Sequence, residues 1–249
     1  MAVKKDTSFI VVIMGLNMLA ILIMYWGLKA GVPDFSAYDA GAERKGAFFN
    51  YFLPLINEQN AEILGTREQL VAWNEDRESL AWWNAWEIEL LADDYGMDNF
   101  DMESDAHWDT LLRRVDVVPP SLALVQAANE SSWGTSRFAR EGNNFYGEWC
   151  YVPGCGIVPK KRGKKERHEV ADFDSPANSV ASYMNNLNYH PAYKTLREIR
   201  AGLRAGDDPI SGIALAEGLH SYSERGEEYI KELRSMITFN SLSQHDEEN

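Results

Sequence analysis

Cysteine, histidine and positive charge are all scarce in this sequence. The 249 residues include two cysteines and five histidines, and 24 lysines and arginines against 38 aspartates and glutamates give a formal net charge of −14. A zinc site at Cys150 and Cys155 would need two further ligands, and His168 is the one candidate nearby. Binding to nucleic acid requires a broad cationic surface, which this composition does not favour. We therefore expect no metal, no cofactor and no nucleic-acid partner.

Charge is also absent from the stretch Phe9–Leu28, which follows Lys4 and Lys5. About 20 apolar residues in a helix span the roughly 30 Å hydrocarbon core of a membrane. A secretory signal would have a shorter apolar region and a cleavage site of small residues, which this sequence matches poorly. The lysines before the run, with Tyr25 and Trp26 at its far end, favour a cytoplasmic N-terminus. We predict a single-pass anchor in the inner membrane over residues 1–30 with a periplasmic domain beyond it; a signal peptide is the alternative.

The two cysteines suit an exported protein. They are spaced C-x-x-x-x-C, with Pro153 and Gly154 between them to turn the chain. A disulfide that closes so small a loop is worth about 2 kcal/mol on the chain-entropy model, and such bonds persist in oxidising compartments. We predict a disulfide between Cys150 and Cys155.

Four segments follow the apolar run. We expect a linker over residues 31–46, a helical accessory segment over 47–116, a main domain over 117–240 and a frayed acidic tail over 241–249. In the accessory segment apolar residues recur at helical spacing, with Pro54 expected to interrupt the first helix, Gly96 to end the second, and Trp108–Val115 to form a third. Four tryptophans occur here: Trp73, Trp82, Trp83 and Trp86. We interpret them as packing residues, with stacking on sugars as the alternative.

The stretch "AANESSWGTSRFA" places Glu130 where an apolar helical run ends. Pro120 and Ser121 predict the start of this helix, with Ser121 as the N-cap, and Gly134 its stop. Gln126 lies one turn before Glu130 on the same face. The sequence therefore predicts an acid in the last helical turn.

Residues 143–174 carry many glycines and prolines and only short alternating pieces, which predicts a hairpin or three-stranded sheet. Helical patterns resume at Ser175. We predict a mainly α protein with a small β lobe, an α+β class.

Three stretches carry a family resemblance: "NESSWGTSRFAREGNNFYGEWC", "HEVADFDSPANSVASYMNNLNYHPAY" and "LHSYSERGEEYIKELRSMI". Together they resemble the Bax-type bacterial glucosaminidases of glycoside hydrolase family 73, which includes flagellar peptidoglycan hydrolases. The similarity covers about half the chain, residues 117–237. It implies a lysozyme-like fold and cleavage of the bond that follows N-acetylglucosamine in peptidoglycan.

The resemblance also implies site residues. Glu130 matches the catalytic acid, and Tyr222 and Tyr229 match a pair of active-site tyrosines. The second carboxylate lies in the β lobe, where Glu169 is our choice and Glu166 and Glu148 are rivals. The expected substrate contacts are Gln126, Trp133, Asn143, Asn144, Phe145, Tyr146 and Tyr229. For the asparagines, hydrogen bonding to the local backbone is the alternative, and for Tyr229 it is packing.

Glycoside hydrolysis needs a protonated acid beside the leaving oxygen. Burial raises the pKa of a glutamic acid toward neutrality, and Ala127, Ala128 and Trp133 are expected to exclude water from Glu130. Two routes complete the reaction: a β-lobe carboxylate activates water, or the substrate's acetamido group attacks while Tyr222 steadies the transition state.

We therefore predict a membrane-tethered endo-β-N-acetylglucosaminidase that acts on peptidoglycan glycan strands. A muramidase or lytic transglycosylase on the same fold, or a non-catalytic wall-binding scaffold, are the alternatives. The basic run Lys160–Arg167 is either a solvated β tip or a contact for anionic stem peptides.

Overall fold

The computed structural model describes residues 31–160, 162–163 and 167–246. The chain divides into Met1–Pro33 and Asp34–Asn249, and the second unit holds the elements described below. The predicted anchor over residues 1–30 lies outside the described residues. Among the helices that the structure does describe, none is long and apolar enough to cross a bilayer.

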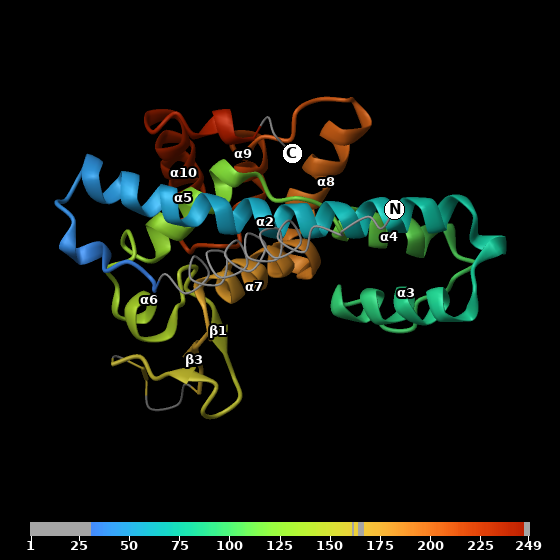
Figure 1. Cartoon of the computed structure of the whole chain (residues 1–249), viewed down its shortest axis with the longest axis horizontal. Coiled ribbons are helices and arrows are strands. Elements are labelled where there is room, and N and C mark those ends of the chain that lie inside the picture. The colour runs from blue at the N-terminus through green and yellow to red at the C-terminus, as the bar shows by residue number, and fades with distance from the viewer. Residues whose placement is uncertain (1–30, 161, 164–166, 247–249) are drawn as a thin grey trace, which may run out of the picture. The chain divides into compact units, whose positions relative to one another are not determined.

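Helices make up most of the second unit (Figure 1). In chain order the elements are η1 (Phe35–Ala37), α2 (Ala42–Glu75), η2 (Arg77–Ser79), α3 (Trp82–Asp94), α4 (Asp105–Arg114), α5 (Pro120–Glu130), α6 (Arg137–Gly142), β1 (Trp149–Cys150), β2 (Gly156–Ile157), β3 (Glu169–Ala171), α7 (Pro176–Tyr189), η3 (Pro191–Tyr193), α8 (Lys194–Ala205), α9 (Gly212–Leu215), η4 (Ala216–Leu219), α10 (Glu227–Phe239) and η5 (Leu242–His245). The predicted class, mainly helical with a small sheet, is confirmed.

The long helix α2 packs against α4, α5 and α7 (Figure 1). Its buried stripe includes Phe52, Ile56, Asn60 and Ile63, at the three- and four-residue spacing of one helix face. Pro54 was expected to interrupt this helix, and that prediction is wrong. Pro54 lies on the exposed face, and burial of the opposite face stabilises a helix that proline alone would break.

Part of the predicted linker, residues 31–46, is folded. Phe35 in η1 is buried, and its ring centroid lies 5.1 Å from that of Phe48 on α2. Gly134, with φ of +75°, lies directly against the Phe35 ring, so a Cβ there would collide with it. A large apolar side chain thus draws the segment into the core.

The tryptophans of the accessory segment divide into two groups. Trp73 packs against the core, as predicted. Trp82, Trp83 and Trp86 on α3 are 78%, 52% and 58% exposed, so the packing prediction is wrong for these three. The opposite face of α3 is the one that packs, through Ile88 and Ala92.

The central helix α5 begins at Pro120, directly after Pro119. Ser121, predicted as its N-cap, instead lies inside the first turn, and its backbone N–H and hydroxyl donate to Asp246 at 2.9 and 2.7 Å. Asp246 also accepts from the backbone N–H of Gly212 on α9 at 3.0 Å. The tail was expected to be frayed, but it is ordered up to residue 246. The Asp246 carboxylate accepts from backbone N–H groups in the first turns of two helices, α5 and α9, which have no partner within those helices.

The small sheet has the antiparallel order β1-β3-β2, in which Trp149 faces Val170 and Gly156 faces Ala171. The predicted disulfide is present, with Cys150 and Cys155 joined across the turn between β1 and β2. The zinc alternative for these two cysteines is therefore excluded. The sheet lies below α6 and α7 in Figure 1.

Candidate active site

Glu130 is the last residue of α5, which places it in the last helical turn as the sequence predicts, although the helix ends four residues before Gly134, the predicted stop. Its Oε1 accepts a hydrogen bond from the Tyr229 hydroxyl at 2.8 Å and a longer one from the Asn129 side chain at 3.4 Å. Burial raises the pKa of Glu130, and these two hydrogen bonds, which stabilise the ionised form, oppose that rise. The net shift is upward, toward the range in which a carboxyl acts as a proton donor near neutral pH.

A buried chain of hydrogen bonds holds Glu130 from behind. Tyr183 on α7 donates to Gln126 at 2.5 Å, and Gln126 donates to the Tyr229 hydroxyl at 3.1 Å. Gln126 is fully buried. The structure therefore gives it a supporting position behind the acid, which differs from the substrate contact we expected.

The other oxygen of Glu130, Oε2, faces Gly147. A Cβ at position 147 would lie 3.7 Å from it, and the φ of Gly147 is +70°. The backbone conformation therefore favours glycine here, whereas a methyl group would fit in ordinary contact with the carboxyl oxygen. Glu130 and Gly147 line a cavity of about 490 Å³, the Glu130 cavity, together with Phe138, Tyr146, Glu148, Trp149, Val170, Asn186, Tyr193 and Tyr222.

Glu148, a rival for the second acid, lies in this cavity. Its Oε2 accepts a hydrogen bond from the Ser182 hydroxyl at 2.8 Å. Its Oε1 is buried, and none of the described residues provides it with a hydrogen-bond partner. Burial raises the pKa of Glu148 to about 7, and the Ser182 hydroxyl limits that rise. Buried polar atoms without a hydrogen-bond partner are rare in folded proteins, so this oxygen is a candidate for a functional role.

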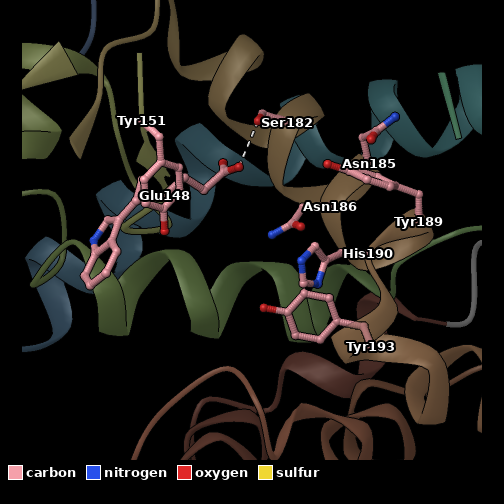
Figure 2. A pocket seen from close by; sticks show the side chains of 9 residues that line it. Glu148, Tyr151, Ser182, Asn185, Asn186, Tyr189, His190 and Tyr193 are labelled. Atoms are coloured by element: carbon pink, nitrogen blue, oxygen red, sulfur yellow. Dashed lines mark hydrogen bonds between the residues drawn. The ribbon is translucent and has the colours of Figure 1, made fainter. Parts of the chain in front are cut away.

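Glu148 also lines a neighbouring cavity of about 590 Å³, the α7 cavity. Figure 2 shows its side chains: Glu148, Trp149, Tyr151, Ser182, Asn185, Asn186, Tyr189, His190 and Tyr193. Sequence reasoning missed the α7 and η3 residues of this set. A signal was present, because positions 182, 185, 186 and 189 recur on one helix face with side chains that form hydrogen bonds and stack on sugars.

Glu169, our choice for the second acid, lies elsewhere. Its Oε2 accepts from the backbone N–H groups of Gly154 and Gly156 at 3.1 and 3.0 Å. It therefore braces the disulfide loop, and it is not among the residues that line either cavity. Glu166, like half of the basic run Lys160–Arg167, lies outside the described residues.

Of the expected substrate contacts, Tyr146 is the one that lines the Glu130 cavity. Asn144 donates to the carbonyls of Glu148 and Ala171 and accepts from the Glu148 N–H, and Asn143 donates to the carbonyl of Phe173. Phe145 is buried in the core. The asparagines thus fit the alternative interpretation, in which they satisfy the local backbone.

Tyr222 lines the Glu130 cavity, and its hydroxyl donates to the Tyr146 carbonyl at 2.9 Å. Its ring stacks on Tyr229, with centroids 5.7 Å apart.

Trp133 packs edge-on against Phe48 and Phe49 of α2. It therefore supports the α5–α2 contact and does not form the wall of the acid's cavity that we expected.

One group of side chains outside the cavities has the composition of a metal site. Ligand atoms of Glu217, His220 and Glu227 lie within 4.8 Å of one another. His220 is 3.3 Å from Glu227, and Glu217 pairs with Arg234 at 2.8 Å. These groups are partly or fully exposed, so their proximity alone does not indicate an ion site.

Comparison with known proteins agrees with this geometry. Residues 106–242 match a glucosaminidase family described as mannosyl-glycoprotein endo-beta-N-acetylglucosaminidase. The chain belongs to the glucosaminidase family. It is also 35% identical to protein bax of Escherichia coli (strain K12) over 215 residues, which cover 85% of this chain and 75% of that protein. No solved structure gives a significant match. Membership of the glucosaminidase family indicates a glycosidase with a glycan substrate, and the matched residues contain both Glu130 and Glu148.

Proposed function

We propose that this glucosaminidase-family protein is a peptidoglycan hydrolase of lysozyme-like fold, an endo-β-N-acetylglucosaminidase with Glu130 as its general acid. The observation that carries the proposal is the pair of half-buried carboxyls, Glu130 and Glu148, that line one cavity. For each of them burial is the main cause of a raised pKa. Two acids around one sugar-sized cavity are what glycosidic cleavage requires.

In the proposed first step, Glu130 donates its proton to the glycosidic oxygen that follows N-acetylglucosamine. The helix end holds the carboxyl in place, and Tyr229 fixes Oε1, which leaves Oε2 on the cavity side beside Gly147. A positioned general acid contributes about 10² to 10⁴ in rate.

In the proposed second step, Glu148 accepts a proton from the water that attacks the anomeric carbon. The Ser182 hydroxyl holds Oε2, and Oε1 is buried without a partner, so in this step the carboxyl turns to bring Oε1 to the cavity surface, where it takes the proton. A pKa of about 7 makes Glu148 a stronger base than an ordinary carboxylate. The rival route relies on the hydroxyl of Tyr222, which is already donated to the Tyr146 carbonyl. This commitment favours the water route.

Digestion of purified sacculi tests the activity. The full chain should release fragments with reducing N-acetylglucosamine ends, and early products should carry the α anomer by NMR, since direct attack of water inverts the configuration. Glu130→Gln and Glu148→Gln should each abolish clearing, and Glu141→Gln, an exposed acid on α6, is the matched control.

The rivals give different results. Reducing muramic acid ends would indicate a muramidase, and anhydromuramic ends a lytic transglycosylase. Clearing that survives Glu130→Gln would refute the proposed acid, and wall binding without any clearing by the unaltered protein would indicate a scaffold. An initial β anomer would replace the water route with attack by the acetamido group.

We also propose a location at the inner membrane, with the domain in the periplasm. The uncharged run Phe9–Leu28 and the lysines before it support this orientation, and the disulfide supports an oxidising compartment. Protease treatment of intact spheroplasts should degrade the domain. A domain protected until the cells are lysed would contradict the proposed orientation.

A further inference from the structure

One buried cation near the α7 cavity forms no close ion pair with a carboxylate of the described residues. Arg197 on α8 is 6% exposed, and its Nη1 donates to the carbonyls of Leu187 and His190, both at 2.9 Å. The ion pairs formed by α8 involve Lys194, Arg200 and Arg204 but not Arg197. Burial, then the nearby charge of Arg114, lowers the pKa of Arg197 to about 10 against the weaker effect of the Glu198 carboxylate, so Arg197 is cationic at neutral pH. Buried charges in proteins are normally paired.

Arg197 lines a third cavity, of about 220 Å³, which we call the arginine cavity. Arg113, Arg114 and Lys194 also line it, against the single carboxylate of Glu198. Glu198 lies 3.4 Å from Lys194, and Arg114 donates to the carbonyls of Tyr95 and Gly96. The cavity is therefore strongly positive in a protein whose net charge is −14.

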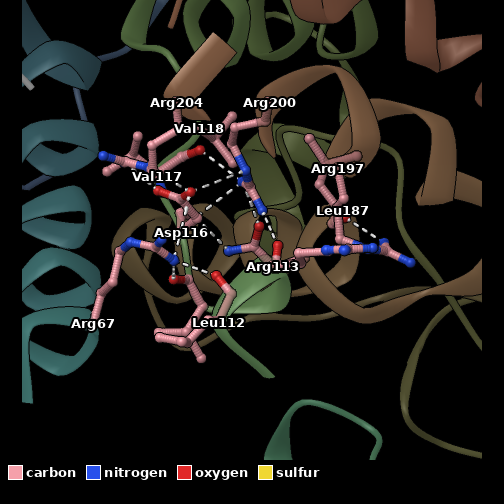
Figure 3. A network of polar contacts seen from close by, with 12 residues as sticks. Arg67, Leu112, Arg113, Asp116, Val117, Val118, Leu187, Arg197, Arg200 and Arg204 are labelled. Atoms are coloured by element: carbon pink, nitrogen blue, oxygen red, sulfur yellow. Dashed lines mark hydrogen bonds and ion pairs between the residues drawn. The ribbon is translucent and has the colours of Figure 1, made fainter. Parts of the chain in front are cut away.

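The nearby Asp116 does not neutralise this charge, because three other arginines already surround it (Figure 3). The Asp116 carboxylate lies 3.6 Å from Arg67, 3.7 Å from Arg200 and 2.5 Å from Arg204. In Figure 3 the Arg197 guanidinium lies apart from this group. Asp116 is thus outnumbered by its own arginines and leaves the positive charge of the arginine cavity uncompensated. An anion bound in the cavity would offset that charge.

The arginine cavity and the α7 cavity share one short turn as a wall. His190 and Tyr193 line the α7 cavity, whereas Pro191 and Lys194 line the arginine cavity. This turn is the 3-10 helix η3, which rises about 2 Å per residue. An extended peptide of three or four residues spans about 10 to 14 Å. A short peptide on a sugar in the α7 cavity would therefore reach across η3.

We propose that the arginine cavity binds a carboxylate of the short acidic peptides attached to the glycan strands. The choice of a peptide rests on the proposed function. The choice of a carboxylate rests on the guanidinium groups, whose planar donors match a carboxylate in two-point hydrogen bonds. Binding here would make the enzyme prefer glycan that carries peptides.

Calorimetry on the full chain tests the site without catalysis. The probes are the free stem tetrapeptide, the same peptide with its carboxyl groups amidated, and inorganic phosphate. Arg113→Gln combined with Lys194→Gln removes two exposed charges of the cavity and leaves buried Arg197 in place. Arg140→Gln combined with Lys231→Gln, exposed cations of α6 and α10, is the matched control.

We expect the tetrapeptide to bind and the Arg113 and Lys194 double variant to weaken it roughly fivefold to thirtyfold, with the control pair unchanged. Equal binding of the amidated peptide, or an unchanged affinity in the double variant, would overturn the proposal. Phosphate binding as tightly as the tetrapeptide would overturn the assignment to a peptide carboxylate.

The readout in activity is separate. On peptide-bearing strands the double variant should lose kcat/KM by a similar factor, and on strands stripped of peptides it should match the unaltered enzyme. Glu130→Gln should still bind the tetrapeptide, because binding does not require the catalytic acid. If the unaltered protein cleaves no glycan, the proposed function is refuted, and the calorimetry still decides whether the arginine cavity binds the peptide.

Discussion

Removal of the Tyr229 hydroxyl should make the catalytic acid weaker and therefore shift activity toward alkaline pH. This hydroxyl donates to Glu130 at 2.8 Å and lowers the pKa of that carboxyl against the effect of burial. A hydrogen bond to a charged group is worth about 1.5 to 3 kcal/mol and one to a neutral group about 0.5 to 1.5 kcal/mol. The difference, about 1 to 1.5 kcal/mol, corresponds to a rise of about one pH unit in the Glu130 pKa for Tyr229→Phe.

The sign follows from the proton that the reaction needs. Activity is lost as pH rises through the point where Glu130 ionises, so a higher pKa moves the alkaline limb of the kcat/KM profile upward by about one pH unit. The same substitution leaves the Gln126 side-chain N–H without its acceptor. Since Gln126 is fully buried, we expect a loss of about 1 to 3 kcal/mol in the free energy of unfolding.

Tyr183→Phe is the matched control. Its hydroxyl donates to Gln126, two steps away from the acid. It should destabilise the fold to a similar degree and leave the alkaline limb in place. If the limb of Tyr229→Phe also stays in place, then either the hydroxyl does not lower the pKa of Glu130 or Glu130 does not control the alkaline limb, and the reasoning is refuted.

The remaining predictions concern stability and the shape of the cavity. Glu148, with its pKa raised by burial from 4.5 to about 7, stabilises the folded state below about pH 4.5 and loses this contribution as pH rises through about 7. The free energy of unfolding of Glu148→Gln, measured with urea, should therefore rise by about 3 kcal/mol relative to that of the unaltered protein between pH 4 and pH 9. Free energies of the two proteins that change in parallel with pH would contradict this. Asp116→Asn should cost about 3 to 5 kcal/mol at pH 7, since it strips three buried or half-buried arginines of their carboxylate. Burial alone would raise the pKa of Asp116, but Arg204, Arg200 and Arg67 hold it below its usual value, so the difference from Asp116→Asn should shrink as acid protonates Asp116; a constant difference would contradict it. Gly147→Ala should reduce kcat at least tenfold with a smaller change in KM, because its methyl group would face the reactive oxygen of Glu130; an unchanged kcat would refute that orientation. Cys150→Ser should cost about 2 kcal/mol in the free energy of unfolding, and dithiothreitol should abolish the difference from the unaltered protein.

Local sequence signals predicted the elements that depend on local physics. The Pro119-Pro120 start and the end of α5 at Glu130, the disulfide loop and the three short strands all follow from turn residues, proline positions and helical spacing. The errors came where tertiary contacts override such signals. Pro54 remains inside α2 because burial of the opposite face outweighs the lost hydrogen bond.

The site was predictable only in part for a related reason. A helix end fixes the position of Glu130, and a helix face marks the stripe from Ser182 to Tyr189. The sequence does not show which glutamate of the β lobe faces the acid. That depends on how the chain turns at Gly147 and on which backbone N–H groups need Glu169. Both are contacts between segments that spacing alone does not relate.

The contact between Asp246 and Ser121 links the order of synthesis to the order in which the active site is completed. The carboxylate that accepts from Ser121, at the start of α5, lies 125 residues further along the chain. A chain emerging during synthesis or export makes the catalytic helix early but leaves its first turn and that of α9 without this partner until residue 246 arrives. Proteolytic trimming of this segment would thus loosen the far end of the helix that carries the acid, so loss of a few residues far from the cavity would act on catalysis.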